Sequence, residues 1–381
     1  MIHNGETYSA IVVGGNHVNS LTMIRCFGKF FDKVLVVLHG CAKCNFSSSR
    51  YIERVSYATN EIDLVNILND YSRTNHCVVI TCSDWSAHVL DAYRDQLSPS
   101  LLIFQTETKG GIDHYMNKWN QIGLAKECGM KVPNSEFVPE NTTGNFERFS
   151  FPCIVKPLYS WMVGKNVRIC QSEENLKEAL SNVDNGGSIV QSLVNKKHEI
   201  VVPGFSVGDC VFLPGIVRKI RDVAGGTTYS RIIPFGCEHE RLKHCVEKMI
   251  SSMSYRGCFG VECIFDGDDY VFIEVNLRND ATFYTMYKAG FDIPRIYCEA
   301  LLSKDASSIE QSPIQSIYAM SEISDFVFVF RKQVSLFGWW KELRKSSCKY
   351  VWDSNDIRLC VSMWCEYFRG VFVNKWKLLS K

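Results

Sequence analysis

The chain has 381 residues, 22% of them charged, and a formal net charge of +1, so it lacks the strong positive field that would favour a nucleic-acid partner. No run reaches the roughly 18 uncharged apolar residues that a membrane-spanning helix needs. The seventeen cysteines are scattered, many of them within apolar runs, which favours reduced thiols in a cytoplasmic protein.

The first 110 residues alternate β-rich runs with amphipathic segments. We expect strands at 9–13, 33–38, 77–81 and 101–104, with helices at 19–31, 61–71 and 85–97 between them. Continuous apolar strands separated by helices predict a parallel sheet that is covered on both faces. The sequence therefore predicts a Rossmann-like N-terminal lobe over residues 1–110.

Two short motifs in this lobe each allow two interpretations. The Gly14-Gly15 turn follows the first strand and is either a simple tight turn or a place where a ligand approaches backbone N–H groups. If the lobe holds substrate, Asn16, His17 and Asn19 would lie at this sheet edge. The close pair Cys41 and Cys44 lacks the further ligands of a structural zinc site, so two ordinary loop cysteines are the favoured interpretation.

Beyond residue 110 the pattern changes from α/β to α+β. A helix is expected at 117–128, strands at 153–157 and 167–170, and a helix from Ser172. From residue 188 to residue 274 strands dominate. We predict one subdomain at 111–187, a second at 188–310, and a C-terminal extension at 311–381.

The segment 260–278 carries the most chemistry. Two apolar strands flank the polar turn Asp266-Gly267-Asp268-Asp269, which predicts a β-hairpin. Glu262 and Glu274 would lie on facing strands, and Asn276 and Arg278 would share the face of Glu274 because side chains alternate along a strand. Two carboxylates and an amide oxygen form a hard oxygen site suited to Mg²⁺ together with phosphate oxygens. The alternative is a sheet with one solvated polar face.

This hairpin resembles the metal-binding hairpin of ATP-grasp enzymes, in which a Glu-x-Asn-x-Arg run follows an earlier Glu. The resemblance implies a Rossmann-like lobe followed by a two-subdomain ATP-grasp fold, with ATP and Mg²⁺ as cofactors. It implies that Glu262, Glu274 and Asn276 bind the metal. For ATP it implies two phosphate-binding lysines, a hinge whose backbone contacts adenine, and an acid for the ribose hydroxyls, which are Lys118, Lys156, the run Gln191, Ser192, Leu193 and Val194, and Glu199.

One feature departs from the family pattern, and for a second the sequence does not decide between two residues. The loop after Lys156 has a single glycine, whereas the family usually has a glycine-rich loop there. Ser160 and the backbone at Gly164 are the candidates for capping the phosphate. The alternative is that this loop, which carries bulky side chains, contacts the acceptor substrate. Arg218 and Lys219 are adjacent in an apolar strand, and alternation directs only one of them into the cleft, where it would bind the γ-phosphate or the acyl phosphate.

The resemblance implies an ATP-dependent carboxylate–amine ligase of the amino-acid or peptide type that acts through an acyl phosphate, with small-molecule substrates. Arg278 would stabilise the tetrahedral oxyanion. The opening Val-Gly-Gly-x-His turn is similar to that of the D-aspartate-ligase-like group. The alternatives are a non-catalytic nucleotide-binding protein that docks on a membrane or a partner, and an ATP-grasp kinase or carboxylase.

The C-terminal extension differs in composition from the rest of the chain. Residues 331–381 hold eleven Lys or Arg, four Asp or Glu, and five of the eight tryptophans. Basic residues mixed with Trp and Phe suit peripheral contact with a membrane, or contact with another polyanionic partner. The other interpretation is a helical extension that packs its aromatic side chains on the core and turns its lysines outward.

Overall fold

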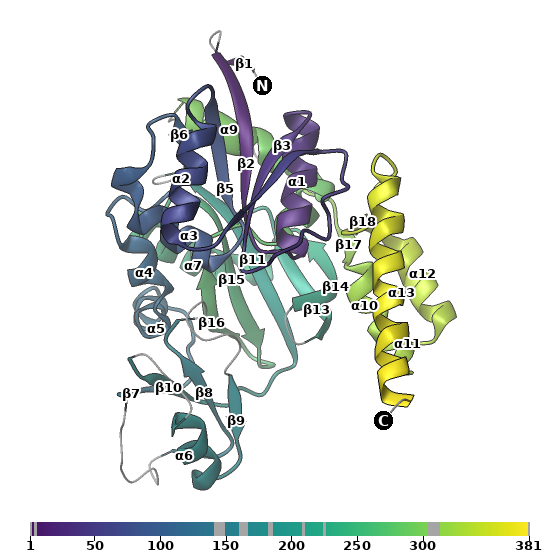
Figure 1. Ribbon diagram of the computed structural model, residues 1–381. Coiled ribbons are helices and arrows are strands. Elements are labelled where there is room, and N and C mark those ends of the chain that lie inside the picture. Colours follow the sequence, from purple (N-terminus) through teal and green to yellow (C-terminus); the bar gives the residue numbers. More distant parts are fainter. Residues whose placement is uncertain are drawn as a thin grey trace.

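The computed structural model describes residues 2–3, 6–140, 149–159, 167–181, 186–207, 210–223, 226–303 and 313–379. Three β-sheets organise these residues (Figure 1). The first lies in the N-terminal lobe, the second in a small lid, and the third forms the body against which the lobe and a group of C-terminal helices pack. The predicted fold class, a Rossmann-like lobe followed by an ATP-grasp arrangement of α/β and α+β units, is confirmed.

The N-terminal lobe is a parallel sheet with strand order β4-β3-β2-β5-β6. The elements in chain order are β1 (Ile2–His3), β2 (Glu6–Gly14), α1 (Val18–Phe30), β3 (Val34–His39), β4 (Ile52–Ala58), α2 (Glu61–Tyr71), β5 (His76–Thr81), α3 (Asp84–Ala92), a 3₁₀ turn (Arg94–Gln96) and β6 (Leu101–Leu102). Because the strands are buried on both faces, they consist of continuous apolar runs. Helices α2 and α3 cover one face, and α1 covers the other.

The lid follows two connecting helices, α4 (Gly111–Met116) and α5 (Lys118–Glu127). Its antiparallel sheet has the strand order β7-β10-β8-β9, and α6 packs on one face. The elements are β7 (Ser135–Val138), β8 (Cys153–Pro157), β9 (Arg168–Cys170), α6 (Glu173–Ser181) and β10 (Ser188–Ser192). Strand β10 pairs with β7 and β8, so the lid sheet extends to Ser192, beyond the subdomain boundary predicted at residue 187.

The body is a largely antiparallel sheet with strand order β16-β15-β11-β13-β14-β17-β18. Its strands are β11 (His198–Val207), β12 (Cys210–Phe212), β13 (Ile216–Val223), β14 (Gly226–Ile233), β15 (Gly257–Phe265), β16 (Tyr270–Asn276), β17 (Ile317–Met320) and β18 (Ser346–Lys349). Helix α7 (Glu240–Ser252) packs its apolar stripe on one face, following the short 3₁₀ turn Cys237–His239. Helices α8 (Thr282–Ala289) and α9 (Ile293–Ser303) join the body to the N-terminal lobe.

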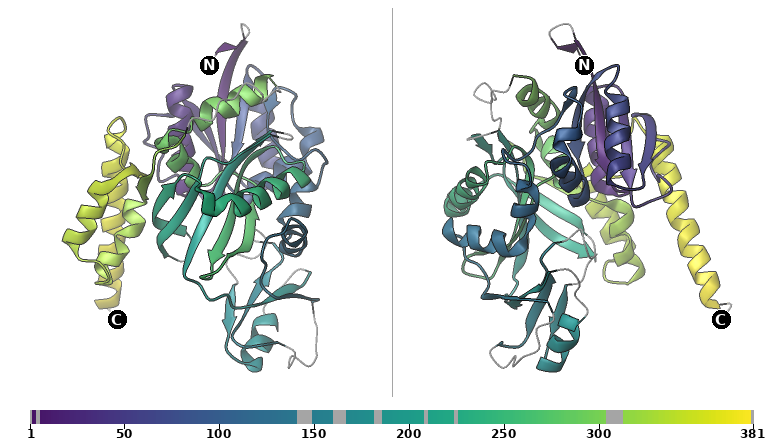
Figure 2. Two further views of the ribbon diagram at one scale, coloured as in Figure 1. Left: turned by 180° about the vertical axis from the view of Figure 1, so that it is seen from behind. Right: turned by 60° about the vertical axis from the view of Figure 1, so that its left-hand side comes forward.

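The C-terminal module, residues 317–379, combines β17 and β18 with four helices (Figure 2). The helices are α10 (Glu322–Asp325), α11 (Val327–Phe330), α12 (Leu336–Lys345) and α13 (Ile357–Leu379). Arg25 of α1 is fully buried and donates hydrogen bonds to the carbonyls of Tyr350 (2.7 Å) and Val351 (2.6 Å). Strand β17 pairs with β14, so the module belongs to the folded body and is not a loose tail.

Candidate functional site

The acidic hairpin formed by β15 and β16 brings three oxygen-bearing side chains together. Glu262 pairs directly with Glu274 across the two strands, and a β-bulge follows Glu262. The Asn276 amide nitrogen lies 3.4 Å from Glu262 Oε1 and donates a hydrogen bond to it. The predicted metal ligands are therefore neighbours on one face of the hairpin.

Two lysines from distant elements neutralise these carboxylates. Lys118 begins α5, where the Asn117 side chain caps the helix, and its Nζ lies 2.8 Å from Glu274 Oε2. Lys219 Nζ lies 2.6 Å from Glu262 Oε2 and 3.3 Å from Glu199 Oε2. The charge of Lys118 lowers the pKa of Glu274 to about 2, whereas burial raises the pKa of Glu262 despite the attraction of Lys219.

A cavity of about 510 Å³ lies between the lid sheet and the body sheet. Lys118 and Glu274 line it, and apolar side chains from both sheets, including Ile154 and Ile264, form much of the wall. The other predicted ATP-binding residues that line it are Lys156, Gln191, Ser192, Leu193, Val194 and Glu199. Its volume is within the range of small-molecule sites. Cationic side chains together with apolar walls suit a nucleoside triphosphate.

The lid contributes its own polar groups to this cavity. Lys156 is buried on β8, and burial lowers the pKa of its ammonium group. Gln191 is buried on β10, and its side-chain amide donates to Ser135 Oγ at 2.8 Å. Glu199 accepts from Lys196 at 2.7 Å; burial would raise the pKa of Glu199, but the hydrogen bond from Lys196 and the charge of Lys219 outweigh burial and lower it.

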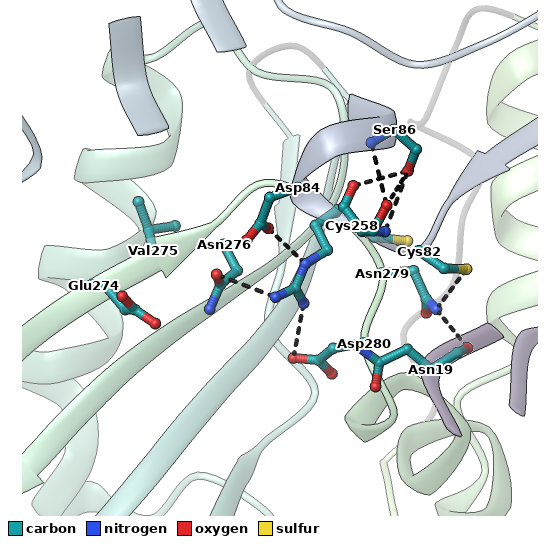
Figure 3. Close-up of polar contacts among 12 residues, drawn as sticks. Asn19, Cys82, Asp84, Ser86, Cys258, Glu274, Val275, Asn276, Asn279 and Asp280 are labelled. Atoms are coloured by element: carbon teal, nitrogen blue, oxygen red, sulfur yellow. Dashed lines mark hydrogen bonds and ion pairs between the residues drawn. The ribbon is translucent and has the colours of Figure 1, made fainter. Parts of the chain in front are cut away.

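Arg278 joins the hairpin to the N-terminal lobe. Its partners Asp84, Asn276 and Asp280 are labelled in Figure 3. Its Nε donates to Asp84 Oδ1 at 2.8 Å, its Nη2 donates to Asn276 Oδ1 at 3.3 Å, and its Nη1 lies 3.9 Å from Asp280 Oδ2. Asp84 is the first residue of α3, at the carboxyl end of the parallel sheet. The guanidinium is therefore held beside the predicted metal ligands, at the crevice where open α/β sheets bind ligands.

The structure separates the two adjacent cations of β13. Lys219 joins the cluster with Glu199 and Glu262, whereas Arg218 is exposed and pairs across the strands with Arg231 on the opposite face. This separation follows from alternation once the register is known. The two residues predicted to cap the phosphate in the loop after Lys156 are Ser160 and Gly164. Both lie outside the described residues.

The sheet edge after β2 contains the other predicted substrate contacts. Asn16 bonds to the backbone of the loop between β3 and β4, donating to Lys43 O at 2.8 Å. Asn19 accepts from the Ala281 backbone N–H at 3.2 Å, and so connects α1 to the segment that follows the hairpin. His17 is exposed at this edge, and the nearby His39 ring contacts Ser83 Oγ at 2.7 Å. Burial lowers the pKa of His39 to about 4, which leaves it neutral at pH 7.

Three residues around the cluster were not predicted from the sequence. Asp84 and Asp280 flank Arg278, and Gln121 of α5 forms two hydrogen bonds with the backbone of Val275, at 2.9 and 3.0 Å. This double contact fixes α5, and with it Lys118, against β16. An acid directly after a parallel strand was a signal that could have found Asp84. Nothing local to Gln121 distinguishes it from a surface glutamine.

The donor set of the hairpin fits a magnesium ion. Two carboxylates and an amide oxygen are hard ligands, and an ion of this kind usually takes its other ligands from phosphate and water. Among the described residues, no group of three or more His, Cys, Asp or Glu side chains could hold a metal ion without such help. Within the same part of the chain, no helix has both the length and the apolar character needed to cross a bilayer.

Comparisons with known proteins agree with this geometry. Residues 123–290 match the model of the ATP-grasp domain. A formate-dependent phosphoribosylglycinamide formyltransferase of Yersinia pestis (strain Pestoides F) is 26% identical over 208 residues, covering 51% of this chain and 52% of that protein. The chain thus spans about half the length of the curated relatives it matches.

Solved structures resemble the chain over more of its length. An N5-carboxyaminoimidazole synthetase from Staphylococcus aureus complexed with ADP aligns with a TM-score of 0.66 and 16% identity, covering 85% of each chain. The L-amino acid ligase from Bacillus licheniformis aligns with a TM-score of 0.63 and 15% identity, covering 83% of this chain and 80% of that one. At such identities the similarity establishes the fold.

Proposed function

We propose, from the match of residues 123–290 to the ATP-grasp domain, that the protein is an ATP-dependent ligase that joins a carboxylate to an amine. One observation carries the proposal: Lys118, Lys156, Glu199 and Glu274 line a single cavity between two sheets. These residues come from four separate elements. A cavity with apolar walls and a few charged side chains is typical of a site that binds a small-molecule ligand.

The nucleotide lies in this cavity in the proposed complex. The adenine packs between the apolar side chains of the lid and the body, next to the backbone of residues 191–194. Glu199 accepts hydrogen bonds from the ribose hydroxyls, and Lys118 and Lys156 neutralise the phosphates. The position of Lys156 supports its role, because a buried ammonium group is costly unless it meets an anion.

Glu262, Glu274 and Asn276 are the proposed ligands of Mg²⁺. When bound there, Mg²⁺ would neutralise charge on the phosphate oxygens. Lys118 and Lys219 already contact the two carboxylates, so in the complex they would shift part of their hydrogen bonding to the phosphates. The site thus keeps its charges compensated both with and without nucleotide.

The proposed reaction has two steps. A substrate carboxylate oxygen attacks the γ-phosphorus, the bond to the β-phosphate oxygen breaks, and ADP leaves. The amine nitrogen of the second substrate then attacks the acyl carbon, the bond to the phosphate oxygen breaks, and phosphate and a proton are released. Arg278 is placed to donate to the oxyanion of this second step, since a guanidinium carries five N–H groups. Both substrates would bind between the hairpin and the sheet edge at Asp84.

We also propose which class of substrate the ligase uses. We favour an amino acid or a peptide-like acceptor, as in the D-aspartate-ligase-like group. The structural similarity to an L-amino acid ligase supports this class of substrate.

The test measures ADP and phosphate release with Mg·ATP and pooled amino acids. We expect both products in equal amounts only when a carboxylate and an amine are present together. Glu274→Gln should lower turnover by at least about 100-fold, since it removes a charge that is matched to the transition state. Glu240→Gln, an exposed glutamate on α7, is the control and should retain full activity.

Two outcomes would contradict the proposal. One is full turnover by Glu274→Gln, which would exclude the hairpin as the site. The other is tight binding of Mg·ATP without ADP release for every acceptor, which would indicate a non-catalytic nucleotide-binding protein.

A further inference from the structure

Helix α12 has two apolar faces, and the protein covers only one of them. The inner face packs Trp339, which is 5% exposed, against Phe326 and Trp364. The outer face presents Leu336, Phe337 and Trp340, which are 59%, 74% and 47% exposed. A surface helix normally needs one apolar face, so the second requires a partner. Figures 1 and 2 show α12 on the outer flank of the C-terminal module.

The exposed apolar side chains form one patch. Phe337 and Trp340 stack with ring centroids 6.3 Å apart. Leu336 lies one helical turn before Trp340 on the same face of α12. We call Leu336, Phe337 and Trp340 the α12 patch.

The surroundings of the α12 patch are cationic. Four exposed cations are Arg331 and Lys332 in the connection and Lys341 and Arg344 on the helix. A fifth, Lys345, lies 4.1 Å from the centroid of the Tyr318 ring. The Arg344 guanidinium lies 4.8 Å from the centroid of the Trp340 ring. Between residues 330 and 345 the sequence contains one acid, Glu342, and its carboxylate lies 2.7 Å from Arg221 Nη2. Because Arg221 of the body neutralises Glu342, the surface around the α12 patch keeps its positive charge.

We propose that the α12 patch docks the protein on the surface of a lipid bilayer that contains anionic headgroups. Aromatic and aliphatic side chains would enter the interface, and the four cations around them would contact the headgroups. Charge complementarity argues against a second copy of the chain. A two-fold contact through this patch would place each set of cations opposite the same set.

If the module binds a membrane, the rest of the protein would be held there too, because the module is connected to the body. Asp325 of α10 is fully buried, and Arg221 of β13 donates to it at 2.7 and 3.0 Å. Glu322 of α10 accepts from the backbone N–H groups of Val351 and Trp352, at 2.8 and 2.7 Å. The Arg221–Asp325 pair thus connects the module to the body, whereas the Glu322 contacts hold the module itself together, and the body would lie at the membrane with the module. The inference does not depend on the ligase proposal.

The test is flotation of the full chain with vesicles of phosphatidylcholine, with and without about one-third phosphatidylserine. We expect co-flotation only with the anionic vesicles, reversed by high salt. Lys341→Gln/Arg344→Gln removes two cations and should lower partitioning by roughly 25-fold, given about a fivefold contribution from each. Phe337→Ala/Trp340→Ala should lower it by at least about tenfold. Ile62→Ala, which truncates an exposed isoleucine on α2, is the control and should have no effect.

Four results would overturn the inference. The first is that the wild-type chain stays in the soluble fraction with the anionic vesicles. The second is equal binding to neutral vesicles. The third is equal binding by Phe337→Ala/Trp340→Ala with an unchanged circular dichroism spectrum. The fourth is a concentration-dependent dimer, detected by light scattering, that this double variant abolishes, which would assign the patch to a second copy. The salt response of the unmodified chain tests the charge contribution even if a variant fails to fold.

Discussion

The ion pair between Lys118 and Glu274 gives a quantitative prediction for stability. Its atoms are 2.8 Å apart, and the two side chains are 8% and 24% exposed. Removing one partner leaves the other charge enclosed, so Lys118→Met or Glu274→Gln should each lower the free energy of unfolding by about 2–4 kcal/mol. The pKa of Glu274, lowered from 4.5 to about 2, corresponds to about 3 kcal/mol and supports the same range.

The double variant should be more stable than the sum of the two losses predicts. With both charges gone, neither is left without its partner, and we expect a coupling energy of about 2 kcal/mol. The sign of the pH dependence follows from the lowered pKa. The stabilisation by Glu274 is fully present above about pH 4.5 and is lost as the pH falls towards 2. Glu274→Gln cannot titrate, so its stability should change less over that range.

Urea denaturation of the four proteins, followed by tryptophan fluorescence at pH 7 and pH 3.5, measures both effects. The control is the pair Glu173 and Lys177 on α6, which has nearly the same separation, 2.7 Å, but is more exposed, at 29% and 55%. Its coupling energy should stay below about 0.5 kcal/mol. Losses at Lys118 and Glu274 that add to within about 0.5 kcal/mol would refute the reasoning, because they would show two independent charges.

Three further predictions test other parts of the cluster and the fold. Lys219→Gln should lower ADP formation at least about 100-fold, whereas Arg218→Gln, one residue away on the other face, should change it by less than about threefold. Mg·ATP should raise the melting temperature of the wild-type chain, and chelation of the metal or Asn276→Leu should remove most of that rise. Arg25→Met should lower the free energy of unfolding by about 2–4 kcal/mol in urea titrations, since two buried carbonyls lose a charged donor; an unchanged midpoint would contradict it.

Much of the acidic cluster could be predicted because its geometry is local. Glu262, Glu274 and Asn276 lie on two consecutive strands joined by a short turn, so alternation and hairpin pairing suffice to bring them together. The bounds of α5 also depend on short-range signals: Asn117 is a favoured N-cap residue, and Gly129 adopts a positive φ of 87° just after the helix ends. Short-range rules thus fixed the positions of the acids and of Lys118 along the chain.

The remaining parts of the site depend on long-range pairing. Arg278 and Asp84 are 194 positions apart in the chain, and no periodicity links them. The choice between Arg218 and Lys219 depends on the register of β13 against β11, where Arg218 lies opposite Ile200 and Val217 opposite Val201. A shift of one residue would exchange the two cations between the faces. The sequence shows that one of them enters the cleft, but the register decides which.

The C-terminal module shows why composition alone left two interpretations open. Trp339 and Trp340 are neighbours in the sequence, yet one packs against Phe326 and the other is exposed, because adjacent residues of a helix lie about 100° apart around its axis. Packing on the core and contact with an external surface therefore do not exclude each other in this helix. The aromatic residues are divided between the two roles. Flotation of Phe337→Ala/Trp340→Ala isolates the outer role, since the inner aromatic cluster remains intact in that variant.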